Sequence, residues 1–194
     1  FENTKELFIA QGTATDAAVS YAGTGDRTNA GTYAVVTTTA ATKAERQGSV
    51  LGGGTITNAE TITVKVGTKE VSYAASAGAT LTSIATGLND QFRVNSLALT
   101  ATVEANKLVI RTNNYGLAST FQVKTNDVAV GQTGIATVVN VYDTLAGIDI
   151  AGTIGGKAAT GTGQTLTVKA EDTSIAGLAV KVNSSLTGAF GNIT

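Results

Sequence analysis

Acidic side chains are the residues of this sequence most able to do chemistry, because it contains no histidine and no cysteine. Asp143, Asp149 and Asp172 stand close to Gly or Thr in segments typical of turns. Two carboxylates within about 10 Å of each other can hydrolyse a glycosidic bond, whereas an Asp in a turn bonds to the nearby backbone. The turn interpretation needs no further partner, so we predict no catalytic residues and a protein that is not an enzyme.

Combinations of residues that form a nucleophilic site or a metal site are also absent from the sequence. Without His or Cys there is no Ser-His or Cys-His pair, no thiolate or imidazole zinc site and no disulfide. No Ser-x-x-Lys provides a lysine-activated serine. Asp26 and Asn29 share one loop and offer two of the several oxygen ligands that calcium needs. We therefore predict no metal site.

The glycine-rich loops do not match nucleotide-binding motifs. Gly23-Thr24-Gly25 and Gly161-Thr162-Gly163 lack the third glycine of the dinucleotide fingerprint, and no Gly-Lys-Thr or Gly-Lys-Ser is present for a P-loop. We interpret both loops as turns and predict no cofactor.

Aromatic residues could instead mark a sugar- or protein-binding face. The tyrosines are spread thinly, at Tyr21, Tyr33, Tyr73, Tyr115 and Tyr142. Because most of them fall where an alternating strand points inward or edge-on, we expect them to pack in the core.

Length and composition favour a folded, β-rich chain. At 194 residues, it is long enough for one large domain or two small ones. Charged residues make up 14% and the net charge is −1, which gives no electrostatic reason to bind nucleic acid or an anionic membrane. Hydrophobic residues reach 42% and alternate with Thr, a pattern of strands rather than disorder. No apolar run of about 18 residues predicts a transmembrane helix, and the first residues do not resemble a signal peptide.

The first part of the chain predicts two strands and a linker. Residues 1–12 carry a weak helical signal. Strands are expected at residues 17–21 and 32–37, joined by a turn-rich loop as a hairpin or a sheet crossing. Residues 40–47 could form a helical turn, and Gly52-Gly53-Gly54 is typical of a linker.

The middle of the chain predicts a compact module. Residues 61–66 and 70–73 form a hairpin around Gly67-Thr68. Thr80 is a candidate helix N-cap, and Gly87 weakens the middle of the helix that follows. One helix face carries Leu81, Ile84, Ala85, Leu88 and Phe92. A second hairpin at 97–103 and 107–111 and a strand at 120–124 complete a β-β-α-β-β unit, with the helix across the apolar face of the hairpins.

The last third predicts strands at residues 148–150, 164–169 and 177–182, in a sandwich or a small barrel. The fold class is therefore mainly β with one short helix, a β-rich α+β protein of two small domains. We place the first domain at residues 1–50 and 136–194, with residues 51–135 inserted into it.

Three stretches of the sequence, taken together, carry a resemblance to one known family. The first joins Leu7-Phe8 and Ala14-Thr15-Asp16 to residues 30–36, the second is the module from about 55 to 124, and the third runs from Asp143-Thr144 through 148–167 to 177–182. The most specific run is Ala-Ala-Thr-Gly-x-Gly-Gln-x-Leu at 158–166. Together they resemble the flagellar filament cap family, also called hook-associated protein 2, and the second stretch is similar to its hook insertion motif.

This resemblance implies a structural role. Cap proteins are secreted through the flagellar export channel, form an oligomeric lid at the filament tip, and help flagellin to assemble. The implied location is extracellular, at the tip of a bacterial flagellum. The implied partners are flagellin and other copies of the chain, with host mucin as a further one because some members are adhesive. The sequence lacks the sustained heptads of the family's helical ends, so we expect this head portion alone to be a monomer or to associate only weakly with itself.

Two other interpretations stay open. The chain could be the variable outer domain of a flagellin or part of another bacterial surface adhesin with similar strands. Alternatively, it could be a hydrolase that uses carboxylates alone, which requires two acidic side chains in one cleft. Coiled-coil ends on the parent protein, without the flagellin terminal pattern, would favour the cap.

Overall fold

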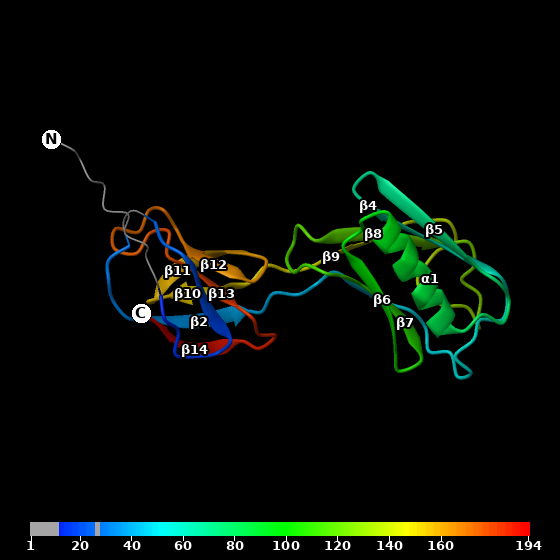
Figure 1. Cartoon of the computed structure of the whole chain (residues 1–194), viewed down its shortest axis with the longest axis horizontal. Coiled ribbons are helices and arrows are strands. Elements are labelled where there is room, and N and C mark those ends of the chain that lie inside the picture. The colour runs from blue at the N-terminus through cyan, green and yellow to red at the C-terminus, as the bar shows by residue number, and fades with distance from the viewer. Residues whose placement is uncertain (1–11, 26–27) are drawn as a thin grey trace. The chain divides into compact units, whose positions relative to one another are not determined.

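The structure, a computed structural model, describes residues 12–25 and 28–194. The helical signal at the N-terminus, the Leu7-Phe8 pair and the calcium candidate Asp26 lie outside the described residues. The chain forms two units. The split unit consists of the described residues up to Ala41 together with Asp149–Thr194, and the inserted unit is Thr42–Ile148. Figure 1 shows the split unit in blue and orange-to-red and the inserted unit in cyan to yellow.

The unit boundaries differ from those expected at 50/51 and 135/136. They fall at 41/42 and 148/149 because β3 (Glu45–Gln47) pairs with β7, and β9 (Asp143–Ala146) pairs with β8, both inside the inserted unit. The helical turn expected at 40–47 is wrong, since β3 lies there. The glycine run is also not a linker. It forms a turn within the inserted unit, where the N–H of Gly54 donates to the carbonyl of Leu51 at 2.9 Å.

The split unit is one seven-stranded antiparallel sheet. In spatial order, its strands are β1 (Val19–Gly23), β13 (Ala179–Val182), β12 (Thr165–Val168), β11 (Lys157–Thr162), β10 (Ala151–Ile154), β2 (Tyr33–Thr39) and β14 (Gly188–Ile193). Since β1 and β2 are not neighbours, the loop between them is a sheet crossing rather than a hairpin. The sheet rolls until the segment before β1 meets β14, where the N–H of Thr13 donates to the carbonyl of Thr194 at 2.8 Å. This closure matches the barrel alternative.

The sequence located only part of this sheet. The strand expected at 148–150 is wrong, because Ile148 makes an isolated bridge to Thr42 and β10 begins at Ala151. The core of the split unit lies inside the rolled sheet, and its fully buried members include Val35, Ile154, Leu166 and Val180.

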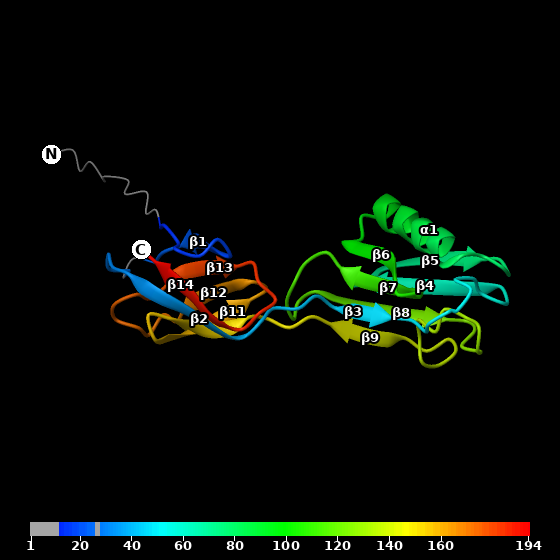
Figure 2. The same cartoon turned by 90° about the horizontal axis from the view of Figure 1, so that it is seen from below.

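The inserted unit contains two sheets and a helix. One sheet has the order β3, β7 (Lys107–Thr112), β6 (Leu99–Glu104). The other has the order β5 (Lys69–Ala75), β4 (Glu60–Val66), β8 (Thr120–Thr125), β9. The helix α1 (Leu81–Val94) packs against β5 and β6, one strand from each sheet, as Figure 2 shows. The two predicted hairpins are confirmed, although they belong to different sheets.

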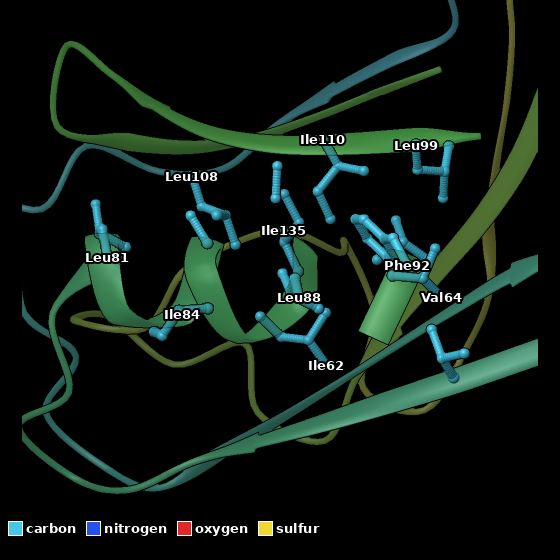
Figure 3. Packing of buried hydrophobic residues seen from close by; sticks show 14 of the residues in the cluster. Ile62, Val64, Leu81, Ile84, Leu88, Phe92, Leu99, Leu108, Ile110 and Ile135 are labelled. Atoms are coloured by element: carbon cyan, nitrogen blue, oxygen red, sulfur yellow. The ribbon is translucent and has the colours of Figure 1, made fainter. Parts of the chain in front are cut away.

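The predicted helix face is confirmed as the centre of this unit. Leu81, Ile84, Ala85, Leu88 and Phe92 are all buried, and Figure 3 shows the labelled ones among residues of both sheets. The Thr80 hydroxyl accepts the N–H of Ser83 at 3.0 Å, as expected of an N-cap. Within residues 12–25 and 28–194, no helix has the length and hydrophobicity needed to span a membrane.

Candidate interaction surface

The three aspartates considered for catalysis are all engaged in hydrogen bonds to the backbone. Each carboxylate accepts a backbone N–H within 3 Å, in the pairs Asp143 with Thr137, Asp149 with Gly163, and Asp172 with Ser174. The N–H groups of Ile175 and Ser174 hold the pKa of Asp172 below its usual range. The turn interpretation fits Asp172, whose partners are two and three positions away. It is wrong for Asp143, which begins β9 and pairs with Arg46, and Asp149 bonds to the N–H of Gly163, 14 positions away.

The interpretation of both glycine runs as turns is wrong in part, because Gly23 ends β1, and Gly161 and Thr162 belong to β11. The glycines serve close packing. A Cβ at Gly25 would lie 2.6 Å from the carbonyl oxygen of Ala176, and one at Gly177 would lie 2.7 Å from the Cα of Gly25, so two backbones cross there. A Cβ at Gly161 would meet the carbonyl of Ile150. In the part of the chain that the structure describes, no three acidic side chains are grouped so that they could hold a metal ion.

Five of the exposed apolar side chains of the inserted unit belong to one loop. We call residues 126–142, which connect β8 to β9, the valine loop. These exposed side chains are Val128, Val130, Val138, Val139 and Val141. The described part of the split unit has one exposed side chain of this kind, Leu186. Gathered apolar side chains in water are typical of protein contact sites.

A buried carboxylate holds the valine loop at its middle. Glu60 of β4 is 1% exposed. It accepts the hydroxyl of Thr133 at 2.6 Å, the N–H of Thr133 at 2.9 Å and the hydroxyl of Thr125 at 2.8 Å. Hydrogen bonds to a charged acceptor are stronger than neutral ones, so this cluster fixes the loop to the sheet.

Arg46 and Ile135 provide a second anchor. Ile135 is fully buried in the core of the inserted unit. The Nε of Arg46 donates to the Ile135 carbonyl at 2.9 Å, and its guanidinium forms an ion pair with Asp143 at 3.1 Å. The loop is therefore ordered at its middle and at its end, and the exposed valines are held in place before any partner binds. Such preorganisation reduces the entropy that binding costs.

A polar cluster lies next to the end of this loop. The ring of Tyr142 has the Nζ of Lys124 at 4.5 Å from its centroid and that of Lys65 at 5.9 Å. Its hydroxyl donates to Glu70 at 2.6 Å. Burial and this carboxylate raise the pKa of Tyr142 to about 12. The tyrosine thus remains a neutral hydrogen-bond donor at any physiological pH.

The other sheet carries an ion-pair network. Arg111 of β7 binds the carboxylates of Glu45 on β3 and Glu104 on β6. The hydrogen bond from Arg111 lowers the pKa of Glu104 to about 2. This network ties three strands together across the sheet.

The expectation that the tyrosines pack in the core holds for three of them. Tyr73 packs against the core of the inserted unit, and Tyr21 and Tyr33 pack against that of the split unit. It is wrong for Tyr115, which is 37% exposed, and for Tyr142, which lies in the polar cluster described above. Both follow irregular segments, so strand alternation does not govern where they point.

The valine loop is the feature that the sequence interpretation missed. Its valines stand among Gly, Asn and Thr without a regular period. Apolar residues inside a turn-rich segment were the available signal, because nothing in such a segment predicts a strand or helix face that would bury them.

Comparison with known proteins supports the fold. No family model and no curated protein matches the chain. Solved structures do. The D2-D3 domains of the flagellar cap protein FliD from Escherichia coli match with a TM-score of 0.58 and 16% identity, over 95% of this chain and 97% of that one. FliD from Bdellovibrio bacteriovorus matches with a TM-score of 0.52 and 17% identity, over 91% and 94%.

A solved structure with an additional domain also matches this chain. The D1-D2-D3 domains of E. coli FliD match with a TM-score of 0.57 and 17% identity, over 95% of this chain. The chain spans 56% of that structure.

The fold thus defines a class, a rolled β sheet carrying an inserted two-sheet unit with one helix. More particularly, it is the fold of the D2-D3 domains of flagellar cap proteins, and the predicted mainly-β fold class is confirmed.

Proposed function

We propose that this chain is the outer part of a flagellar cap protein, and that it works outside the cell at the tip of a bacterial flagellar filament. One observation carries the proposal: the nested pair of units follows the E. coli FliD D2-D3 structure along nearly the full length of both chains. At this level of identity the likeness concerns the fold, so the role at the filament tip needs its own test.

The proposed role is contact rather than catalysis. The protein would meet flagellin and other copies of itself and promote the assembly of arriving flagellin. The exposed valines of this anchored loop support such a role, because exposed apolar side chains on an ordered segment suit protein contacts. The three candidate aspartates support it too, since the carboxylate of each accepts a backbone N–H. Binding to host mucin stays a prediction.

Deleting the codons for residues 1–194 from the chromosomal gene tests the role. We expect short or absent filaments and unassembled flagellin in the medium, as seen by electron microscopy and by blotting for flagellin, with recovery when the full gene is restored. Filaments of normal length in the deletion strain would refute the cap role. Normal length with an altered filament surface would favour the outer domain of a flagellin.

The contact surface has a separate test. Val130→Asp combined with Val139→Asp places two charges on the valine loop, and because both side chains are exposed, folding should be unaffected. We expect shorter filaments from this variant. The matched control is Val50→Asp, at a valine that is 60% exposed outside the loop. Normal filaments from the double variant would exclude the valine loop as the contact surface without affecting the cap role.

A further inference from the structure

One sheet edge of the inserted unit is covered by a side chain instead of a strand. In the sheet β3-β7-β6, the strand β6 lies at one edge, and β7 is its neighbour among the described strands. The other edge strand, β3, has only three residues, whereas β6 has six. A long free edge offers backbone N–H and C=O groups to any strand that arrives from outside. The edge of β6 is therefore the one in this sheet that most needs protection.

Asn89 of α1 occupies this edge near its middle. Its Nδ2 donates to the carbonyl of Ala101 at 2.8 Å, and its Oδ1 accepts the N–H of Ala101 at 2.8 Å. Two residues that face each other on antiparallel strands exchange the same pair of hydrogen bonds. The Asn89 amide thus takes the place that a residue of an added strand would fill.

The residues along this edge would suit an added strand if Asn89 were absent. Because the hydrogen-bonding direction alternates along an antiparallel strand, Leu99 and Val103 direct their backbone groups to the same side as Ala101. All three residues are apolar, and Val103 is 37% exposed. The N–H of Leu99 is already bonded to the carbonyl of Leu97 at 2.9 Å. Ala101 and Val103 are therefore the two residues that could offer an N–H to an incoming strand.

The long edge strand of the other sheet, β5, has a different protection. It begins with Lys69 and Glu70, which are both exposed, and charged side chains on an edge strand disfavour pairing with another chain. The strand β6 carries no charged residue from Leu99 to Val103. Its edge therefore depends on Asn89.

We propose that Asn89 blocks the edge of β6, and that without its amide two copies of the chain pair with each other through this edge. A second copy fits because an antiparallel pair about a twofold axis brings the same surface of both chains together. With Thr102 on the axis, Ala101 of each copy lies opposite Val103 of the other, and both face the shared edge. The inference goes beyond the cap role and does not depend on it.

Asn89→Ala in the 194-residue chain tests the proposal by analytical ultracentrifugation over a range of concentrations. We expect the variant to form a dimer with an association constant at least about tenfold above that of the unchanged chain. At concentrations where the variant is monomeric, its Ala101 amide should exchange with solvent about tenfold faster or more, as measured by NMR. Adding Val103→Lys should restore the weaker association, because a charge then lies on the edge. The matched control is Asn95→Ala, which removes a 2.9 Å hydrogen bond to the Gln91 carbonyl within the same helix and should associate as the unchanged chain does.

Three outcomes would overturn the inference. One is an Asn89→Ala variant that associates no more strongly than the unchanged chain. Another is association that survives the addition of Val103→Lys, which would mean that the contact lies elsewhere. A third is equal association of Asn95→Ala, which would assign the effect to a weakened helix. If Asn89→Ala does not fold by circular dichroism, Asn89→Ser takes its place, since serine is polar but too short to make both bonds, and the same three outcomes apply.

Discussion

Glu60 shows how this protein uses charge where it cannot reach water. Among the described residues, it is the one charged side chain that is fully buried. Its two carboxylate oxygens receive three hydrogen bonds from Thr125 and Thr133. A buried charge is tolerated only when it is hydrogen-bonded in this way, so the position of the valine loop and the burial of Glu60 depend on each other.

Removing this carboxylate should therefore release the loop. We expect Glu60→Ala to lower the free energy of unfolding of the inserted unit by about 2–4 kcal/mol, because it leaves buried donors unpaired and a cavity. Glu60→Gln should cost about 1 kcal/mol, since one amide oxygen can still accept. Urea unfolding followed by circular dichroism measures both. The control Asp90→Ala, on the exposed face of α1, should change stability by less than about 0.5 kcal/mol. Equal effects of all three would contradict this account.

Glu104 gives a pH dependence of known sign. Its pKa is near 2 in the folded state against 4.5 for the free group, so the folded protein holds the proton less tightly than the unfolded chain. The stabilisation is present above pH 4.5 and is lost as the pH falls towards 2. Thermal unfolding of the chain and of Glu104→Gln should therefore differ at pH 6 and converge near pH 2. A difference that grows on acidification would show the sign to be wrong.

At the residue scale the sequence reveals local bonds and misses distant ones. The turn role of Asp172 could be predicted because its partners Ser174 and Ile175 are two and three positions away. The partner Thr133 of Glu60 is 73 positions away. The alternation of β4 places Glu60 on the same face as the buried Ile62 and Val64. Nothing in a single sequence shows that Thr133 meets the carboxylate there.

The helix α1 contains a glycine that intrinsic propensity disfavours by about 1 kcal/mol. Its environment explains the choice. A Cβ at Gly87 would lie 2.0 Å from Cε2 of Tyr73, on the inward face of β5. The bare helix backbone thus receives the tyrosine ring, and helix and strand approach more closely than a side chain would allow.

Gly87→Ala should accordingly destabilise the protein, by about 1–3 kcal/mol for an overpacked core. In the Tyr73→Ala background the clash is gone, and the same change should stabilise by about 1 kcal/mol through helix propensity. A thermodynamic cycle of the four variants measures the change of sign. The control Thr86→Ala, on the exposed side of the helix, should not depend on Tyr73. If Gly87→Ala stabilises the chain with Tyr73 present, the packing account fails.

At the element scale, local signals were sufficient for the hairpins and α1. Two-residue turns and helical spacing depend on residues close together in the sequence, and these elements are confirmed. The strands β3, β9 and β14 could not be predicted in the same way. β3 has three residues and β9 has four, and β14 contains two glycines. These strands exist because a neighbouring strand, distant in the sequence, supplies their hydrogen bonds.

In the whole molecule, one unit is inserted into the sequence of the other. The composition of the chain does not show this arrangement. Residues 42–148 lie between the two segments of the split unit, and the limits of this insertion depend on where β3 and β9 find partners. Those pairings are tertiary, and the glycine run that looked like a boundary is an internal turn.

The oligomeric state of the chain alone remains a prediction. We expect a monomer, because the exposed apolar side chains outside the valine loop are scattered over several elements, whereas stable interfaces bury about 1,200–2,000 Å². Size-exclusion chromatography with light scattering should give a mass near 19.4 kDa. A stable ring would contradict this expectation and would assign ring formation to these residues.

The bridge between Thr42 and Ile148 has a consequence for how such a protein can change. The N–H of Thr42 donates to the carbonyl of Ile148 at 2.9 Å, and the N–H of Ile148 donates back at 3.2 Å. The entrance and exit of the inserted unit are thereby stapled together. Residues 42–148 therefore enter and leave the inserted unit at adjacent points. A different module whose two ends lie equally close could replace them without changing the distance between Ala41 and Asp149 in the split unit.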